Sequence, residues 1–217
     1  HLPALGRHFV EATLAHWREW VRGLAIPYEW QSAVIRAAIT LKLNAFDDTG
    51  AIIAAMTTSI PEAPDSGRNW DYRYCWLRDA HFSLSAFYNL GHFEEMEGFL
   101  KFLLNVCYAR EQSHDRLAPV YTLSQDLPLP ETEHSNWRGF LGSGPVRSHN
   151  QAAEHVQNDV YGEMLLTLAP IFFDNRFYDL RTRDHEALVA NLIRLCERSI
   201  SQPDAGLWEI RNGWQEH

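Results

Sequence analysis

Apolar residues recur three or four positions apart along most of the chain, which is the spacing of one face of an α-helix. This pattern predicts helices over residues 9–24, 30–41, 80–90, 93–109, 152–173 and 183–201. Pro27 closes the first of these segments and Gly91 stops the third, because proline and glycine end helices. The sequence therefore predicts an all-α protein.

The segments between these helices alternate between tight turns and long polar stretches. Residues 52–58 are short, apolar and partly β-branched, so they are predicted to be extended. Residues 111–150 are rich in Pro, Gly, Ser and polar side chains, and a loop of that length is usually functional or disordered. Three aromatic residues argue against simple disorder there: Tyr121, Trp137 and Phe140.

The rhythm of helices and loops indicates a ring of helical hairpins, with the long loops gathered at one end where they carry function. About six helices are visible, whereas a closed double ring of helices needs roughly twice that number. The chain is therefore predicted to form part of a barrel. Its open side would expose apolar helix faces, which a missing C-terminal half or another chain would have to cover.

Charge and composition narrow the classes of partner and the location. The net charge of −9 and the dispersed Lys and Arg residues argue against nucleic acid, and no apolar stretch is long enough for a membrane span. The three cysteines form neither a CxxC pair nor a disulfide framework, so we predict a reduced, cytoplasmic location. The histidines lack metal-pair spacing, and we predict no metal and no cofactor.

One run of residues is unusually dense in aromatic and charged side chains. Residues 68–80 read RNWDYRYCWLRDA and lie directly before an apolar helix. Aromatic faces hold the apolar faces of sugar rings, while Arg and Asp make paired hydrogen bonds to neighbouring hydroxyl groups. The run therefore predicts one wall of a carbohydrate-binding site.

Four motifs, in order along the chain, resemble one enzyme family. Residues 69–79, NWDYRYCWLRD, resemble the signature of glycoside hydrolase family 15, the glucoamylase, glucodextranase and trehalase group. Residues 49–62 resemble the segment that precedes that signature, and residues 139–163 resemble the next active-site loop and its helix. Residues 206–211 resemble the strip that carries the catalytic acid. The resemblance runs from about residue 8 to the end.

The resemblance implies an (α/α)6 barrel, a six-hairpin toroid. Residues 1–27 resemble the end of a linker helix from a missing N-terminal domain, and residues 28–217 resemble the first half of the catalytic domain. Members hydrolyse α-glucosidic bonds from a non-reducing end with inversion, which needs a carboxylic acid and a carboxylate base. Glu209 matches the acid, and the family's base lies beyond His217, so the 217-residue chain alone is expected to be inactive.

The resemblance also implies a role for several other residues, each with a structural alternative. Arg78 and Asp79 match a clamp on adjacent hydroxyls of the terminal glucose, although a helix start also suits a structural ion pair. Trp76 is expected to stack beside this clamp, and Trp208 to line the leaving-group subsite unless it is a core residue. Arg147 follows a turn-rich loop that presents it either to sugar or to solvent.

Three functions are compatible with these residues, and in each the partner is an oligosaccharide or polysaccharide. The first is an inverting, exo-acting α-glucosidase of glucoamylase type that releases glucose from α-glucans. The second keeps this mechanism with trehalose or an α-1,6-glucan as substrate. The third is a non-catalytic sugar-binding or regulatory domain, against which the presence of Arg78, Asp79 and Glu209 argues.

Overall fold

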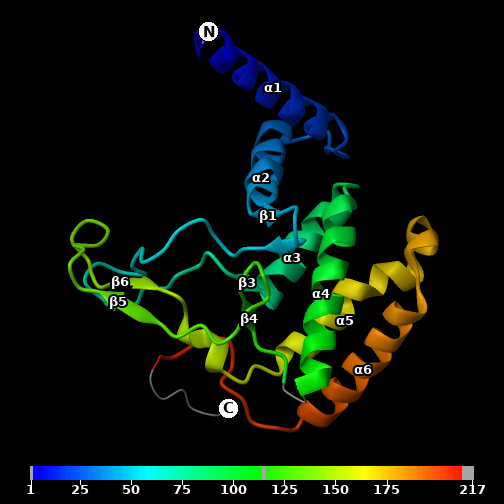
Figure 1. Cartoon of the computed structure of the whole chain (residues 1–217). Helices are drawn as coiled ribbons and strands as arrows, with labels where there is room; N and C mark the ends of the chain where they lie inside the picture. The colour runs from blue at the N-terminus through cyan, green and yellow to red at the C-terminus, as the bar shows by residue number, and fades with distance from the viewer. Residues whose placement is uncertain (1, 114–115, 212–217) are drawn as a thin grey trace.

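The computed structural model describes residues 2–113 and 116–211, and these are mainly helical (Figure 1). The α-helices are α1 (Leu2–Arg22), α2 (Gln31–Leu43), α3 (Leu77–Asn89), α4 (Glu94–Ser113), α5 (Asp159–Phe173) and α6 (Arg183–Ser199). Two 3-10 helices, η1 (Gln151–Glu154) and η2 (Asn175–Leu180), lie on either side of α5. The predicted all-α fold class is confirmed. Within the described ranges, no helix has the length and apolar character that crossing a membrane requires.

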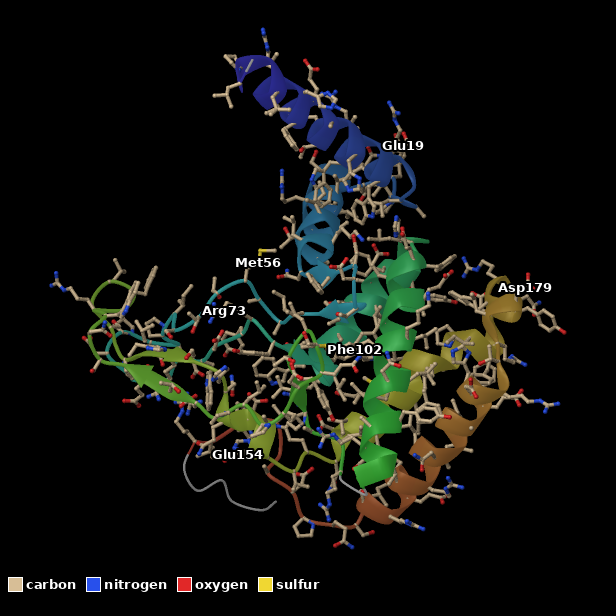
Figure 2. The ribbon with its side chains drawn as sticks, viewed as in Figure 1. Glu19, Met56, Arg73, Phe102, Glu154 and Asp179 are labelled. Carbon is tan, nitrogen blue, oxygen red and sulfur yellow. The ribbon has the colours of Figure 1, made fainter. Side chains whose placement is uncertain are left out.

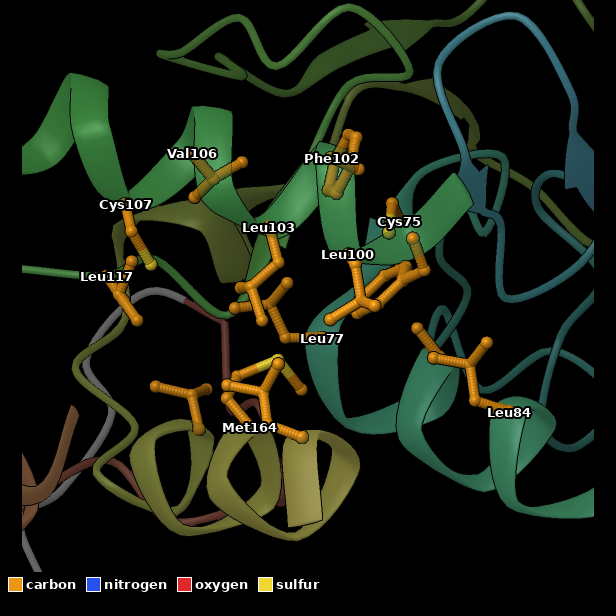
Figure 3. Packing of buried hydrophobic residues seen from close by; sticks show 14 of the residues in the cluster. Cys75, Leu77, Leu84, Leu100, Phe102, Leu103, Val106, Cys107, Leu117 and Met164 are labelled. Carbon is orange, nitrogen blue, oxygen red and sulfur yellow. The ribbon is translucent and has the colours of Figure 1, made fainter. Parts of the chain in front are cut away.

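The main hydrophobic core lies among α3, α4, α5 and α6. Leu103 of α4 points toward Met164 of α5, Leu77 of α3 lies between the two helices, and Val106 belongs to the same cluster (Figure 3). These side chains are all buried, and burial of aliphatic groups is the main force that holds the helices together. The core therefore fixes the start of α3 against the start of α5.

Helices α1 and α2 extend away from this core (Figure 1). A smaller cluster attaches them, in which Trp20 and Leu24 pack with Ala38 of α2 and Phe87 of α3. Most other side chains of α1 are exposed, and Figure 2 shows them spreading into solvent as far as Glu19. The division of the chain between residues 27 and 28 stays a prediction.

Three two-stranded antiparallel ribbons order the long segments between the helices. Strand β1 (Ala45–Phe46) pairs with β2 (Ala51–Ile52), β3 (Cys75–Trp76) with β4 (Val120–Tyr121), and β5 (Thr132–His134) with β6 (Val146–Ser148). The segment predicted as one loop over residues 111–150 thus contains β4, β5 and β6. In Figure 1 these long segments lie together on one side of the helices.

Helix α3 begins three residues earlier than its apolar pattern predicts. The Leu77 N–H donates to the Pro119 carbonyl oxygen at 3.0 Å, where β3 ends beside β4. This contact lets the helix start directly after the strand. Arg78 and Asp79 consequently lie in the first turn of α3, ahead of the apolar stretch.

The helix predicted over residues 152–173 is interrupted, and this part of the prediction was wrong. Between η1 and α5 the backbone is open, because it pairs with a segment distant in sequence. The Ala205 N–H donates to the Val156 carbonyl at 2.8 Å, and the Asn158 N–H donates to Asp204 Oδ2 at 2.7 Å. The opened segment carries Gln157, whose side chain is turned inward and buried.

Candidate active site

A carboxylate from the end of the described chain lies among hydrogen-bond donors from two other segments. The Glu209 residue is only 8% exposed, although it lies in a segment without regular secondary structure. Its Oε1 accepts hydrogen bonds from Trp76 Nε1 at 2.8 Å, from Arg78 Nη2 at 3.3 Å and from Gln157 Nε2 at 3.3 Å. The carboxylate is therefore held from three directions.

Arg78 connects the segments that form this cluster. Its Nη1 donates to Gln157 Oε1 at 2.9 Å and to Asp159 Oδ2 at 3.0 Å, while Nη2 reaches Glu209. The planar guanidinium presents its donors in a fixed fork, so it can bind several acceptors without moving. Arg78 thus joins the first turn of α3 to the opened segment, to the first residue of α5 and to Glu209.

Trp76 supplies an aromatic wall beside the cluster. It lies in β3, opposite Val120 of β4, and packs with Leu129 and Ala152 in a small apolar group. Its ring is almost wholly buried, and its indole N–H points to Glu209. The Tyr72 ring lies 5.8 Å from it, centroid to centroid, at an angle of 48°. A polar N–H at the edge of an apolar face suits both a carboxyl group and a sugar ring.

Carboxyl groups are numerous around Arg78. Burial raises the pKa of Asp79 above its ordinary value, the positive charge of Arg78 opposes that shift, and the charge of Glu209 adds to it. Burial, followed by the charge of nearby Asp159, raises the pKa of Glu163 to about 7. The Glu163 Oε2 atom is buried and has no hydrogen-bond partner among the described residues. The cluster therefore tends to keep a proton at neutral pH.

This arrangement suits chemistry on neutral, hydroxyl-rich molecules. Buried carboxyl groups can hold and release a proton, and the same groups, together with Arg78 and Gln157, can donate to and accept from several hydroxyls. Among the described residues, no group of three or more His, Cys, Asp or Glu side chains has the arrangement of a metal site. The buried carboxyl groups around Arg78 favour acid–base chemistry.

The structure brings some of the predicted site residues together and leaves others apart. Trp76 and Arg78 both donate hydrogen bonds to Glu209, and Asp79 is close enough for the charge of Glu209 to shift its pKa. Trp208 is 69% exposed beside them. Arg147, by contrast, is buried in a separate cluster, whose contacts are described below.

Sequence reasoning missed three polar residues of the site: Gln157, Asp159 and Glu163. Asp159 and Glu163 are spaced i, i+4, which places both on one face of the helix that begins at Asp159. Two acidic residues on one face of an otherwise apolar helix were a usable signal. Gln157 offered none, because it lies in a segment where the apolar pattern predicts helix.

The raised pKa of Glu163 predicts how stability depends on pH. The folded state binds this proton more tightly than the unfolded state between the ordinary value of 4.5 and about 7, so stability should fall as pH rises through that range. After allowance for partial solvent access, we expect a loss of about 1 to 2 kcal/mol between about pH 5 and pH 8.

Glu163→Gln should remove most of this loss, because glutamine does not ionise. Urea denaturation at several pH values measures it, with Glu197→Gln on the exposed side of α6 as the matched control. Parallel stability curves for the original protein and Glu163→Gln would contradict the raised pKa.

Comparison with known proteins identifies the family of this chain. Residues 30–217 match the family described as glycosyl hydrolases family 15. The chain is similar to a trehalase of Mycolicibacterium smegmatis, with 35% identity over 90% of this chain and 29% of that protein. It is also similar to a trehalase of Mycobacterium tuberculosis, with 34% identity over 90% of this chain and 28% of that protein. A trehalase of Thermoplasma acidophilum is 30% identical over 93% of this chain and 33% of that protein.

No solved structure matches this chain significantly. The chain spans between 28% and 33% of the length of the three trehalases. The family match, by contrast, covers residues 30–217 and includes every residue of the cluster around Arg78. This chain therefore belongs to glycosyl hydrolases family 15.

Proposed function

We propose that this chain forms the terminal-glucose subsite and the general-acid wall of an inverting trehalose hydrolase. The observation that carries the proposal is the buried Glu209 carboxyl, held by Trp76 and Arg78 beside an excess of carboxyl groups. The choice of trehalose as substrate is supported by the names of the similar proteins from three organisms. Trehalose replaces the α-glucans, which the sequence motifs alone made the first choice of substrate.

The proposed reaction uses Glu209 as the proton donor. A water molecule attacks the anomeric carbon of one glucose as the bond from that carbon to the bridging oxygen breaks. The electron pair of that bond stays on the oxygen, which takes the proton of the Glu209 carboxyl group. A second carboxylate on the opposite face of the sugar takes a proton from the attacking water, as inversion requires.

The other residues of the cluster would bind the glucose whose bond is cleaved. Arg78 and Asp79 would hold adjacent hydroxyls, because a guanidinium and a carboxylate side by side offer donors and acceptors together. The edge of the Trp76 ring would form one wall of the glucose-binding pocket. Trp208 would face the departing glucose. Trp208 is 69% exposed, so its ring is free to stack on a sugar.

Trehalose offers a stereochemical test because both of its glucose units have the α configuration. Inversion at one anomeric carbon releases one β-glucose and one α-glucose, whereas retention releases two α-glucose molecules. We therefore expect the product of the complete reading frame that encodes this chain, called the full-length protein below, to release both anomers in equal initial amounts. Proton NMR during the first minutes of reaction measures the two anomers.

A substrate panel separates trehalose from the alternatives. Faster glucose release from maltooligosaccharides or isomaltose than from trehalose would replace trehalose with an α-glucan, and no release from any of the three would favour a non-catalytic, sugar-binding domain.

The 217-residue chain on its own serves as a further sample. It should release no glucose, since the resemblance places the water-activating carboxylate after His217, and measurable turnover by it would contradict that assignment.

A further inference from the structure

The backbone at Glu209 adopts a conformation that this residue rarely takes. Its φ angle is +52°, in the left-handed region, which costs free energy for any residue with a side chain. Its neighbours give little support, because Leu207, Trp208 and Ile210 are 60%, 69% and 43% exposed. Such a conformation persists only where other contacts fix the chain on both sides.

On the N-terminal side, the Ala205 N–H is paired with Val156, as described above. On the C-terminal side, the contacts come from Arg211. Its Nη2 donates to the Asn69 carbonyl oxygen at 2.8 Å and to Glu131 Oε2 at 2.9 Å. Its guanidinium carbon lies 3.8 Å from the centroid of the Trp70 ring. Arg211 therefore ties the segment of Glu209 to the run that carries Trp76 and Arg78.

Glu131 connects Arg211 to a second arginine. The Glu131 Oε1 atom lies 2.6 Å from Arg211 Nε and 2.9 Å from Arg147 Nη1. Arg147 also donates from Nε to Asn69 Oδ1 at 3.0 Å and contacts Glu133. The side chains of Arg147, Glu131 and Arg211 are 9%, 10% and 15% exposed. Their charges, with that of Glu133, cancel.

We propose that Arg211, Glu131 and Arg147 form a latch that holds Glu209 in its left-handed conformation and aims its carboxyl group at the sugar. On this proposal, which rests on the general-acid role of Glu209 proposed above, Arg211 and Glu131 are positioning residues. The latch joins residues 69–70, the β5–β6 ribbon and the segment around Glu209. The side chains of these three residues are 15% exposed or less, so water screens their contacts little, and the 57% exposed Glu133 balances the excess positive charge of the two arginines.

If the latch positions Glu209, loosening it should lower the hydrolysis rate by a factor that depends on the leaving group of the substrate. Cleavage of trehalose needs a well-placed proton, and a misplacement of about 1 Å costs about 10²-fold in rate. Cleavage of α-glucosyl fluoride needs little proton donation, because fluoride leaves readily without it. A loosened Glu209 should therefore slow the first reaction far more than the second, whereas general damage to the fold would slow both equally.

The test uses the full-length protein with three variants. Arg211→Met removes both the positive charge and the planar guanidinium group, whereas Arg211→Lys keeps the charge without the planar group. Glu131→Gln keeps the size and shape of the side chain between the two arginines but removes its negative charge. Arg22→Met is the matched control, since Arg22 pairs with Glu19 at 3.2 Å on α1 with both side chains more than 70% exposed. We expect kcat for trehalose to fall about 10²-fold in Arg211→Met and about 10-fold in Arg211→Lys and Glu131→Gln.

The rate with α-glucosyl fluoride should change by about threefold or less in all three variants. Hydrogen exchange of a peptide covering residues 205–211 gives a second readout that does not depend on activity. It should accelerate in the three variants and stay unchanged in Arg22→Met.

Equal losses on both substrates, or unchanged exchange at residues 205–211, would overturn the latch. If the original full-length protein hydrolyses neither substrate, the proposed function fails, and the exchange result still decides whether Arg211 and Glu131 hold this segment. Faster hydrogen exchange at residues 205–211 in the variants would then show that the latch holds this segment without a role in catalysis.

Discussion

Replacing Glu209 by glutamine is expected to lower kcat for trehalose by about 10³- to 10⁴-fold in the full-length protein, the upper range for loss of a general acid. Glutamine is nearly the same shape, and its oxygen can still accept from Trp76 and Arg78, but it has no carboxyl proton to give. Substrate binding should therefore persist. Measuring kcat by glucose release and affinity by calorimetry checks both parts.

Two comparisons make this result specific to proton donation. Glu197→Gln, which changes an exposed glutamate on α6, should leave kcat unchanged. Hydrolysis of α-glucosyl fluoride by Glu209→Gln should fall much less than hydrolysis of trehalose. Near-normal turnover of trehalose by Glu209→Gln would remove Glu209 from the general-acid role.

The second large effect is expected from Arg78→Lys, which keeps the positive charge but removes the planar fork. Arg78 contacts Gln157, Asp159 and Glu209 at the same time, with distances of 2.9, 3.0 and 3.3 Å. An ammonium group on a flexible stem cannot reproduce this geometry, so kcat/KM for trehalose should fall about 10²-fold. Steady-state kinetics measure the loss.

A variant that also removes the positive charge of residue 78 separates the effect of the guanidinium geometry from the effect of its charge. Arg78→Met leaves Asp79, Asp159 and Glu209 without the guanidinium, and because Asp159 is 35% exposed we expect a cost of about 1 to 3 kcal/mol for these partly buried carboxylates. Thermal unfolding should therefore show Arg78→Met far less stable than Arg78→Lys. Arg198→Lys on the exposed side of α6 is the control. An Arg78→Lys variant with unchanged kcat/KM would contradict the clamp.

The helices were predictable because their signal is local. Apolar residues three or four apart mark the face that a helix buries, so five of the six predicted segments correspond to single α-helices. The exception is the segment predicted over residues 152–173. Its break at residues 155–158 depends on pairing with residues 204–205, and no local pattern encodes such a contact.

The candidate site was predictable where chemistry is concentrated in one run. Residues 68–80 placed Trp76, Arg78 and Asp79 side by side, and the motif at residues 206–211 singled out Glu209. Arg147 was expected to face either a sugar or solvent, and the structure places its guanidinium group between Glu131 and Asn69. The sequence showed an arginine after a turn-rich loop, but not which carboxylate lies opposite it.

The sequence by itself determined the helical class, the family and the types of residue available for catalysis, because each depends on spacing along the chain or on a short motif. The tertiary structure decided which of those residues meet. Folding brings Gln157, Asp159 and Glu209 to Arg78, and pairs Arg211 with Glu131, through contacts across 79 to 131 residues of chain. Such contacts arise from packing of whole elements against a shared core, so local spacing cannot specify them.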